Sequence, residues 1–541
     1  MGAAIQTALE NFVNAQSMPL EPPSGERTCP EGRIRIGVFF DGTGNNKWRD
    51  WGNAGKTMNF EGAEFLNDAE ARKPNGKGKK VGKNGPTNVA KLFEIYKPPS
   101  LPTLNKVYHH GVGSDYDYDE DTVVRTGTPS AQKKYGNGMT GGGLGFGGKE
   151  RIQWGLNQLA EFYSAGTSPL SPEKFFDVFG FSRGAALARD FVNAVKTLGV
   201  ADLNTPLHTI YVEVHLPDGQ VVRVPRKVHD LIARNTITPK FMGVFDTVDM
   251  FNTGDTFNLY VDHAYVEHCV HLVAEDEFRM LFPLTSIFMD PNDTDSWFSS
   301  TRNKYQNPRR YKKWMLEIWY PGCHSDVGGS YLARAEKPAV PPSVRRVVDE
   351  WGGSHEVPIP GKPAVPGKRH ELAHIPLRDM HNACMRVGVP MNPLSTLPGN
   401  LHEIPGDLGR AYNEYCNWRK NTDFAQLTEK DNSRYVHSYP NAKFRSLFYT
   451  STKYKDFLQP WNWHRADPNA RESQPSVQAL QAWIHDSSAE FALTGWAEKN
   501  VVQTRLQRSV IYSDAQPSVG APGKIGNEAV VRDYNLPKPG R

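Results

Sequence analysis

The sequence predicts a doubly wound α/β domain with a mainly parallel sheet. Five short runs are almost entirely apolar, as expected for strands that are buried on both faces of such a sheet. Stretches with the apolar spacing of amphipathic helices alternate with these runs, and this alternation is typical of a doubly wound domain. The chain has 541 residues, of which 38% are apolar, so it can bury a large core.

Each element follows from its own sequence pattern. The predicted strands are the continuous apolar runs Ile34–Phe40, Lys106–His110, Phe175–Phe179, Phe241–Phe245 and Trp314–Trp319. The predicted helices have the spacing of one apolar helix face and span Asn88–Tyr96, Lys149–Tyr163, Ala185–Leu198 and His263–Glu277. A Pro-Asp-Gly turn at residues 217–219 predicts a hairpin inserted at about residues 209–225.

The alternation of strands and helices is confined to one part of the chain. Residues 1–32 read as a polar lead-in segment, and the α/β domain is expected over residues 33–335. The proline-rich residues 336–369 are expected to form an exposed excursion. Residues 370–514 are aromatic-rich and irregular but include a helical pattern, and residues 515–541 are expected to be a loose tail.

Composition excludes several classes of protein. Lys and Arg total 63 against 59 Asp and Glu, and a net charge of +4 over this length argues against a nucleic-acid partner. Mean hydropathy is −0.57, and no apolar run approaches the roughly 18 residues of a membrane-spanning helix. The first twenty residues lack the basic and apolar regions of a signal peptide. The five cysteines form no C-x-x-C pattern, so we expect synthesis in a reducing cytoplasm.

The most informative stretch is residues 175–186, FFDVFGFSRGAA. It is a predicted strand followed by Gly-x-Ser-x-Gly and the start of a helix, which in α/β-type hydrolases places a nucleophilic serine on a strained turn. Gly180 and Gly184 lack the β-carbons that would clash as the backbone doubles back. The N-terminus of the following helix favours a developing negative charge. We therefore predict that Ser182 is a nucleophile; an ordinary tight turn is the alternative.

A serine nucleophile needs two partners, a histidine that accepts its proton and a carboxylate that orients the histidine. In this type of fold the chain order is serine, acid, histidine. Asp246 directly follows the strand Phe241–Phe245, and His324 follows the last predicted strand. Both therefore arrive at the carboxyl edge of the sheet in the required order. We predict Asp246 as the acid and His324 as the base, with Asp249 as the alternative acid.

The loop after the first strand is the candidate for a second oxyanion donor. Its sequence at residues 39–46 is FFDGTGNN, and the glycines let backbone N–H groups approach a substrate. We predict an oxyanion hole formed by the N–H of Arg183 together with the N–H of Gly42 or Thr43. Asp41 could instead position this loop or help to hold a cation.

Four motifs occur in order along the chain: FFDGTGNN at residues 39–46, GFSRGA at 180–185, VFDTV at 244–248 and CHSDVGGSY at 323–331. Together they resemble the α/β-hydrolase phospholipase effectors of bacterial type VI secretion, the first family of such lipase effectors. The resemblance covers about residues 33–331 and extends weakly through the helical stretch 372–387. It implies phospholipase A activity, with Ser182, Asp246 and His324 as the catalytic triad.

The same resemblance implies further parts and partners. It implies a secretion spike protein for delivery into the target-cell periplasm, a periplasmic immunity protein, and a membrane-anchoring part beside the catalytic module. No motif marks the anchoring part, so we place it by inference in residues 370–514. Phe457, Trp461 and Trp463 lie among cations there and are candidates for membrane contact. Ordinary core packing is the alternative for these aromatic residues.

No cofactor or metal is required by any motif. The acidic run Asp115–Asp121 mimics a calcium-binding loop, but it has Glu120 where the glycine turn belongs and Thr126 where the bidentate glutamate belongs. The seventeen histidines include no His-Glu-x-x-His pair. Calcium dependence is therefore not supported by the sequence.

The leading hypothesis is an antibacterial effector that hydrolyses phospholipid acyl esters with a Ser-His-Asp triad. One alternative is a cytoplasmic serine esterase that acts on a soluble ester. Another is a patatin-like lipase with a Ser–Asp dyad, because the sequence that begins at Asp326 is similar to the acid loop of that class. A histidine two residues before Asp326 favours the triad. A scaffold without activity would require the whole triad to be accidental.

Overall fold

The structure is a computed structural model that describes most of residues 34–421 and short segments beyond them. The described residues are 34–54, 57–58, 84–98, 103–114, 147–165, 173–215, 220–249, 257–262, 264–277, 279, 282–287, 314–334, 343–348, 354–359, 367–421, 458–461, 478–485, 501–502, 505–506 and 508–511.

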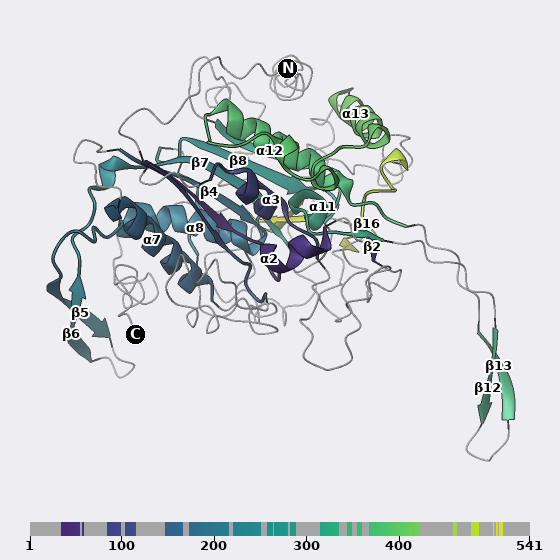
Figure 1. The fold of residues 1–541 in the computed structure, drawn as a ribbon. Helices are drawn as coiled ribbons and strands as arrows, with labels where there is room; N and C mark the ends of the chain where they lie inside the picture. The colour runs from purple at the N-terminus through teal and green to yellow at the C-terminus, as the bar shows by residue number, and fades with distance from the viewer. Residues whose placement is uncertain are drawn as a thin grey trace.

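Six parallel strands form the central sheet (Figure 1). Their order across the sheet is β10-β8-β7-β4-β1-β3, and every neighbouring pair is parallel. In chain order they span Ile34–Phe40 (β1), Leu104–His109 (β3), Lys174–Phe181 (β4), Ile237–Phe245 (β7), His268–Ala274 (β8) and Trp314–Tyr320 (β10). The predicted α/β architecture with a parallel sheet is confirmed.

Helices cover both faces of the sheet (Figure 1). The main helices span Asn88–Ile95 (α3), Gly148–Ala165 (α7), Arg183–Leu198 (α8) and His374–Arg386 (α12). One hydrophobic core joins the sheet to α7 and α8, and a second core joins it to α3 and α12. Successive residues of β1 alternate between the two, with Val38 and Phe40 in the first and Phe39 in the second. This two-sided burial explains why the strand sequences are apolar at successive positions.

The order of the strands determines where a site can form. The chain runs from β1 to β3 on one side and then returns to β4 on the other side of β1. The carboxyl ends of β1 and β4 therefore flank the point where the strand order reverses. Open α/β sheets bind their ligands beside such a point. The two loops singled out in the sequence, after Phe40 and after Phe181, both begin there.

The predicted helix His263–Glu277 is wrong, because this stretch contains the strand β8 between β7 and β10. The polar residue His271 within this stretch gave it the mixed polar and apolar pattern of an amphipathic helix. In the sheet His271 is fully buried and its Nδ1 lies 3.0 Å from Oε2 of Glu317 on β10. A polar side chain that is paired inside the core can occupy an inner strand. In the sequence, such a polar residue interrupts the apolar run by which a buried strand is recognised.

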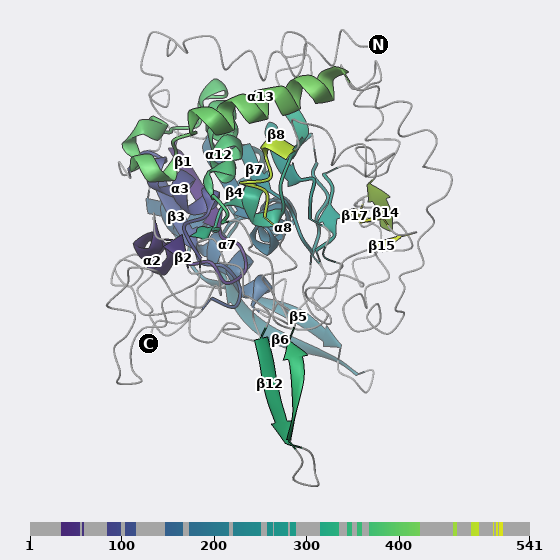
Figure 2. The same cartoon turned by 90° about the vertical axis from the view of Figure 1, so that its right-hand side faces the viewer.

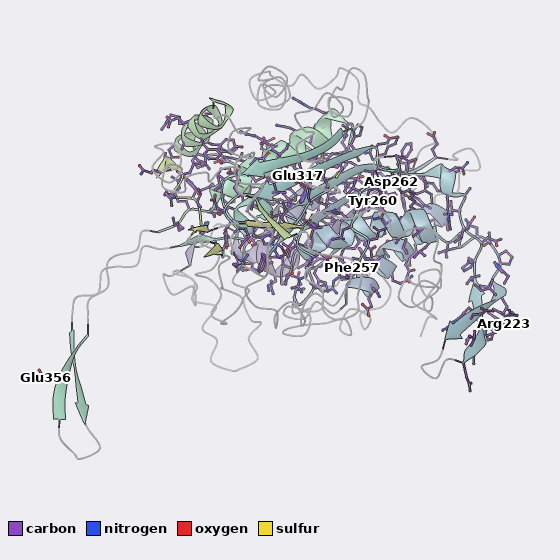
Figure 3. The ribbon with its side chains drawn as sticks, turned by 180° about the vertical axis from the view of Figure 1, so that it is seen from behind. Arg223, Phe257, Tyr260, Asp262, Glu317 and Glu356 are labelled. Atoms are coloured by element: carbon purple, nitrogen blue, oxygen red, sulfur yellow. The ribbon has the colours of Figure 1, made fainter. Side chains whose placement is uncertain are left out.

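Two hairpins project from the body of the molecule (Figures 1 and 2). They consist of β5 (His208–His215) with β6 (Val221–Val228), and of β12 (Ser343–Val348) with β13 (Ser354–Ile359). The first lies where the sequence predicted an inserted hairpin, and the second lies in the proline-rich excursion. Figure 3 shows Arg223 on the first and Glu356 on the second, both away from the central sheet. Arg223 pairs with Glu213 of the facing strand at 2.9 Å.

The chain after α12 adds the helix α13 (Gly406–Asn421) and a small sheet. In this sheet β14 (Leu458–Trp461) pairs with β17 (Arg508–Ile511), which also pairs with β9 (Leu284–Thr285). Trp461 ends β14, whereas Phe457, Trp463 and the acidic run at residues 115–121 lie outside the described residues. Within the described part of the chain, no helix combines the length and the apolar character that crossing a bilayer requires.

Candidate active site

Ser182 occupies a strained turn between β4 and α8. Its φ of 58° and ψ of −126° lie in a region that side-chain-bearing residues rarely adopt. The turn is held by the Ser182 N–H, which donates to the Phe245 carbonyl of the neighbouring strand at 3.0 Å. Arg183 begins α8, so the positive end of that helix points at the serine. This is the geometry that the Gly-x-Ser-x-Gly sequence predicted.

The two glycines of the motif are required by close backbone contacts. A β-carbon at Gly180 would lie 2.4 Å from the carbonyl oxygen of Gly184. A β-carbon at Gly184 would lie 2.3 Å from the carbonyl oxygen of Phe40, at the end of β1. The absence of both side chains therefore lets the helix start approach the loop that carries Gly42 and Thr43.

Asp246 and His324 form a buried hydrogen-bonded pair. His324 is the first residue of the short helix α11 (His324–Gly328), and its Nδ1 lies 2.5 Å from Oδ2 of Asp246. The other oxygen of Asp246 accepts from the N–H of Ala274 at 2.9 Å, which fixes the orientation of the carboxylate. Asp246 also has a left-handed backbone, with φ of 40°. The structure thus brings Asp246 rather than Asp249 to the histidine.

The imidazole of His324 contacts two aromatic rings. The ring of Phe181, which precedes Ser182, lies 4.6 Å from it between centroids, and the ring of Phe282 lies 5.3 Å away at 72°. The contact with Phe181 places the histidine beside the turn that carries Ser182. Burial lowers the pKa of His324 below its ordinary value, although its hydrogen bond to Asp246 opposes this shift. The imidazole therefore favours the neutral form that can accept a proton.

A second charged pair adjoins the histidine and was not predicted from the sequence. Arg279 makes two hydrogen bonds of 2.8 Å to the two carboxylate oxygens of Glu277, and its guanidinium lies 3.4 Å from the ring centroid of Phe282. Glu277 also accepts from the N–H of His324 at 3.3 Å. Glu277 therefore supports the start of α11, and Arg279 packs on the Phe282 ring that contacts the imidazole. The two residues are separated by one position, and that spacing is too common to mark a site.

The loop after β1 is fixed by Asp41. Its carboxylate accepts from the N–H of Gly42 at 2.7 Å, from Oγ1 of Thr87 at 2.8 Å and from the hydroxyl of Tyr108. Burial raises the pKa of Asp41 to about 6, and the hydrogen bonds from Tyr108, Thr87 and Gly42 limit the rise. Asp41 thus positions the loop, one of the two roles that its sequence context left open.

Thr43 lies next to the serine turn through a side-chain contact. Nε of Arg183 donates to Oγ1 of Thr43 at 2.6 Å. Of the two candidate donors in the loop, Gly42 already donates its N–H to Asp41. Gly42 is also required for space, since a β-carbon there would lie 2.4 Å from the ring of Phe181.

Behind Asp246 lies another histidine–carboxylate pair that has a supporting role. Nδ1 of His271 contacts Glu317, and Nε2 of His271 accepts from the N–H of Thr247 at 3.1 Å. His271 and Thr247 are fully buried. Because its acceptor nitrogen is already used by the backbone, His271 holds the turn after Asp246 in place.

The helix α11 is also tied to a distant part of the chain. Nδ1 of His485 lies 2.6 Å from Oδ1 of Asp326, and the His485 N–H donates to Oδ2 of Asp326 at 3.0 Å. The same Oδ2 accepts from the N–H of Cys323, which caps α11. The His485 ring also stacks on Tyr331 at 4.2 Å. Both oxygens of Asp326 are thus occupied, which argues against the Ser–Asp dyad alternative. A lone histidine 161 residues after His324 gave no sequence signal.

No group of three or more metal-ligating side chains is assembled anywhere in the ranges that the structure describes. The site that the structure builds consists of a serine turn, a buried carboxylate–histidine pair and a loop held by Asp41.

The chain was compared with curated proteins and with solved structures. None of the curated proteins matches the chain. The chain is similar to the solved structure of the Tle1 effector bound to the VgrG spike from the type 6 secretion system, with 18% identity, a TM-score of 0.39, and coverage of 71% of this chain and 78% of that one. It is also similar to an uncharacterized protein from Pseudomonas aeruginosa, with 20% identity, a TM-score of 0.37, and coverage of 82% of this chain and 57% of that one.

The family comparison covers the described site. The model of the type VI secretion family described as phospholipase effector Tle1-like, catalytic domain, matches residues 35–383. This match contains β1 through most of α12, and with them Ser182, Asp246 and His324. The chain therefore belongs to the Tle1-like phospholipase effector family of the type VI secretion system.

Proposed function

We propose that the protein hydrolyses the acyl ester bonds of phospholipids, an activity of the phospholipase A type, with Ser182, His324 and Asp246 as a catalytic triad. The observation that carries this proposal is the buried contact of 2.5 Å between His324 and Asp246, beside the strained turn of Ser182. Membership of the phospholipase effector family supplies the substrate class.

The proposed reaction begins with proton transfer to the histidine. As Oγ of Ser182 attacks the acyl carbonyl carbon, Nε2 of His324 takes the hydroxyl proton. The Nδ1–H of His324 donates to Asp246, which keeps the imidazole in the required tautomer and stabilises the imidazolium that forms. The carbon–oxygen bond to the lysophospholipid then breaks, and the leaving oxygen takes the proton from His324. Water attacks the acyl-serine in the second half and releases the fatty acid.

Two backbone N–H groups are proposed to stabilise the oxyanion. Arg183 begins α8, where the helix favours negative charge. The second donor in our proposal is Thr43, because the N–H of Gly42 is directed to Asp41. The hydrogen bond from the Arg183 side chain to the Thr43 hydroxyl keeps the two residues that supply these N–H groups next to each other. Removing one such donor typically lowers kcat by about 10²- to 10³-fold.

The test of this function is product identification. Purified protein is incubated with phosphatidylethanolamine that carries different acyl chains at its two positions, and fatty acid and lysolipid are identified by mass spectrometry. The proposal requires matched release of one fatty acid and the corresponding lysolipid. Hydrolysis of soluble short-chain esters only, with intact phospholipid, would instead support the esterase alternative.

We also propose that the enzyme is antibacterial and acts in the periplasm of a target cell after delivery on a secretion spike. The family description supports secretion by the type VI machinery. A periplasmic immunity protein and a membrane-anchoring part within residues 370–514 complete this proposal. Expression with an added export signal should then be more toxic than cytoplasmic expression. Equal growth in the two cases would contradict the site of action without affecting the esterase chemistry.

The pH dependence of kcat/KM should reflect the lowered pKa of the buried His324. Only neutral His324 can accept the serine proton, and burial lowers its pKa below the ordinary 6.5. The value of kcat/KM should therefore rise as pH increases through a midpoint below 6.5 and be level near neutrality. The measurement is hydrolysis of a soluble short-chain ester from pH 4.5 to 8. A midpoint above 6.5 would contradict the role that we give to desolvation.

Loss of His485 should reduce turnover through α11. Without its contact to Asp326, the helix that carries His324 loses one of its anchors. We expect His485→Ala to lower kcat by about 10- to 100-fold with little change in KM, since small displacements of catalytic groups are costly. His485→Asn keeps a side-chain N–H donor and should recover much of the activity. The control is His208→Ala, which changes an exposed histidine and should leave kcat unchanged. Unchanged kcat in His485→Ala would contradict the role that we give to His485.

A further inference from the structure

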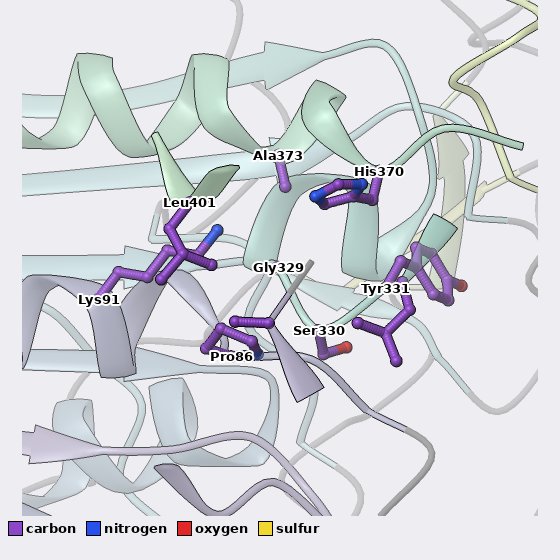
Figure 4. A pocket seen from close by; sticks show the side chains of 10 residues that line it. Pro86, Lys91, Gly329, Ser330, Tyr331, His370, Ala373 and Leu401 are labelled. Atoms are coloured by element: carbon purple, nitrogen blue, oxygen red, sulfur yellow. The ribbon is translucent and has the colours of Figure 1, made fainter. Parts of the chain in front are cut away.

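A small cavity lies behind α11, separate from the proposed triad. Six segments of the chain line it: the residue after the 3-10 turn Trp51–Asn53, the end of the loop before α3, α3 itself, the residues after α11, the residues before α12, and the turn at Gly399–Leu401 (Figure 4). Its volume of about 10 Å³ gives room for about one water-sized particle. The lining residues are Ala54, Pro86, Lys91, Gly329, Ser330, Tyr331, Leu332, His370, Ala373 and Leu401.

Lys91 is the notable side chain of this cavity. It extends from α3 toward the cavity beside Leu401 (Figure 4) and is only 3% exposed. Among the described residues, its ammonium takes part in no hydrogen bond or ion pair. Lys106 gives the contrast, because it is similarly buried but its ammonium donates to the carbonyls of Phe93, Glu94 and Tyr96. A buried ammonium without a partner is strongly unfavourable.

The remaining lining favours a negative ligand. No acidic residue lines the cavity. Nδ1 of His370, on the opposite side from α3, is buried and has no hydrogen-bond partner among the described atoms. Ser330 has a left-handed backbone with φ of 92°, a strained conformation that is held at the cavity wall. A cationic side chain without a partner and a space for one small particle are the elements of an anion site.

We infer that this cavity binds one small monovalent anion, of the size and chemistry of chloride or bromide, against the ammonium of Lys91. The anion compensates the buried charge and ties α3 to the segment that follows α11. It lies outside the acyl-transfer chemistry and does not depend on the proposed function.

Binding should be coupled to pH through several groups. Burial lowers the pKa of Lys91 to about 7, so the ammonium that attracts the anion is lost as pH rises above 7. Burial also lowers the pKa of His370 and His374, and the Lys91 ammonium adds to both shifts. His402 acts on His374, and Glu371 and His485 act on His370. Glu371 also pairs with Arg369 at 3.3 Å. Because Lys91, His370 and His374 lose their positive charge as pH rises, the anion is held more strongly below pH 7.

The direct test is a crystal of the full chain soaked in sodium bromide at pH 6. Anomalous diffraction at the bromine absorption edge should place a bromide within hydrogen-bond distance of Nζ of Lys91, and none at Lys106, whose ammonium is already saturated by carbonyls. Water or empty space beside Lys91 in the soaked crystal would overturn the inference.

A solution measurement provides the second readout. At equal ionic strength, sodium bromide should raise the melting temperature above that in sodium gluconate at pH 6, by about 2–4 °C when the anion exceeds its Kd several-fold. The rise should shrink at pH 8.5 and disappear in Lys91→Met. Lys240→Met, which removes a lysine paired with Glu267 elsewhere, should keep the effect. An equal rise in Lys91→Met would overturn the assignment, and if that variant does not fold, the crystal result decides.

Discussion

Ser182→Ala is expected to abolish ester hydrolysis while the protein remains folded. The substitution removes only the hydroxyl that attacks the acyl carbon, and alanine fits the space of serine. Precedent for triads puts the loss in kcat at about 10⁴-fold or more. The measurement is the initial rate of fatty-acid release from phospholipid and from a short-chain ester, with the melting temperature measured in parallel.

The control for this substitution is Ser164→Ala on α7. Ser164 is also buried, and its hydroxyl oxygen accepts from the N–H of Leu203 at 2.9 Å, remote from the turn after β4. This variant should keep the wild-type turnover and lose only modest stability. If Ser182→Ala keeps near-normal activity on a short-chain ester, the protein is not a hydrolase of the proposed kind.

Asp246→Asn should cause the second large loss. The amide is nearly isosteric, but it no longer favours the tautomer of His324 that presents Nε2 as the proton acceptor. The corresponding change in a Ser-His-Asp triad lowers kcat by about 10⁴-fold. The measurement is single-turnover acylation with a chromogenic ester, which separates the chemical step from release of lipid products.

Asp249→Asn is the matched comparison. Asp249 lies three residues further along the same loop, is also buried, and was the alternative acid from the sequence. Because the contact of 2.5 Å joins His324 to Asp246, the Asp249 variant should retain most of the activity. Normal turnover in Asp246→Asn with loss in Asp249→Asn would transfer the role to Asp249.

Much of the site could be predicted from the sequence, because short local patterns mark its residues. A strand, two glycines and a helix start place Ser182, and strand ends followed by polar residues place Asp246 and His324. Parallel strands deliver their carboxyl ends to one edge of the sheet, so these short patterns imply proximity without knowledge of the packing. The strained backbone at Ser182 and Asp246 occurs where the sequence places the chemistry.

The parts that the sequence did not predict depend on pairings between distant residues. The helix expected at His263–Glu277 is the strand β8, because the contact of His271 with Glu317 on β10 lets a polar side chain occupy an inner strand. The contact of His485 with Asp326 joins residues far apart in the chain. Neither pairing leaves a pattern within one stretch of sequence, so both required the packed structure.

The central claim is that Ser182 is the activated nucleophile of this site, and covalent labelling tests it most directly. A fluorophosphonate reacts with a serine that is activated by a histidine and displaces fluoride to form a stable phosphonyl ester. We expect one label per chain, located on Ser182 by peptide mass spectrometry, with loss of activity in proportion to labelling and none in Ser182→Ala. A label on another serine that accounts for the loss of activity, or equal labelling of Ser182→Ala, would contradict the account.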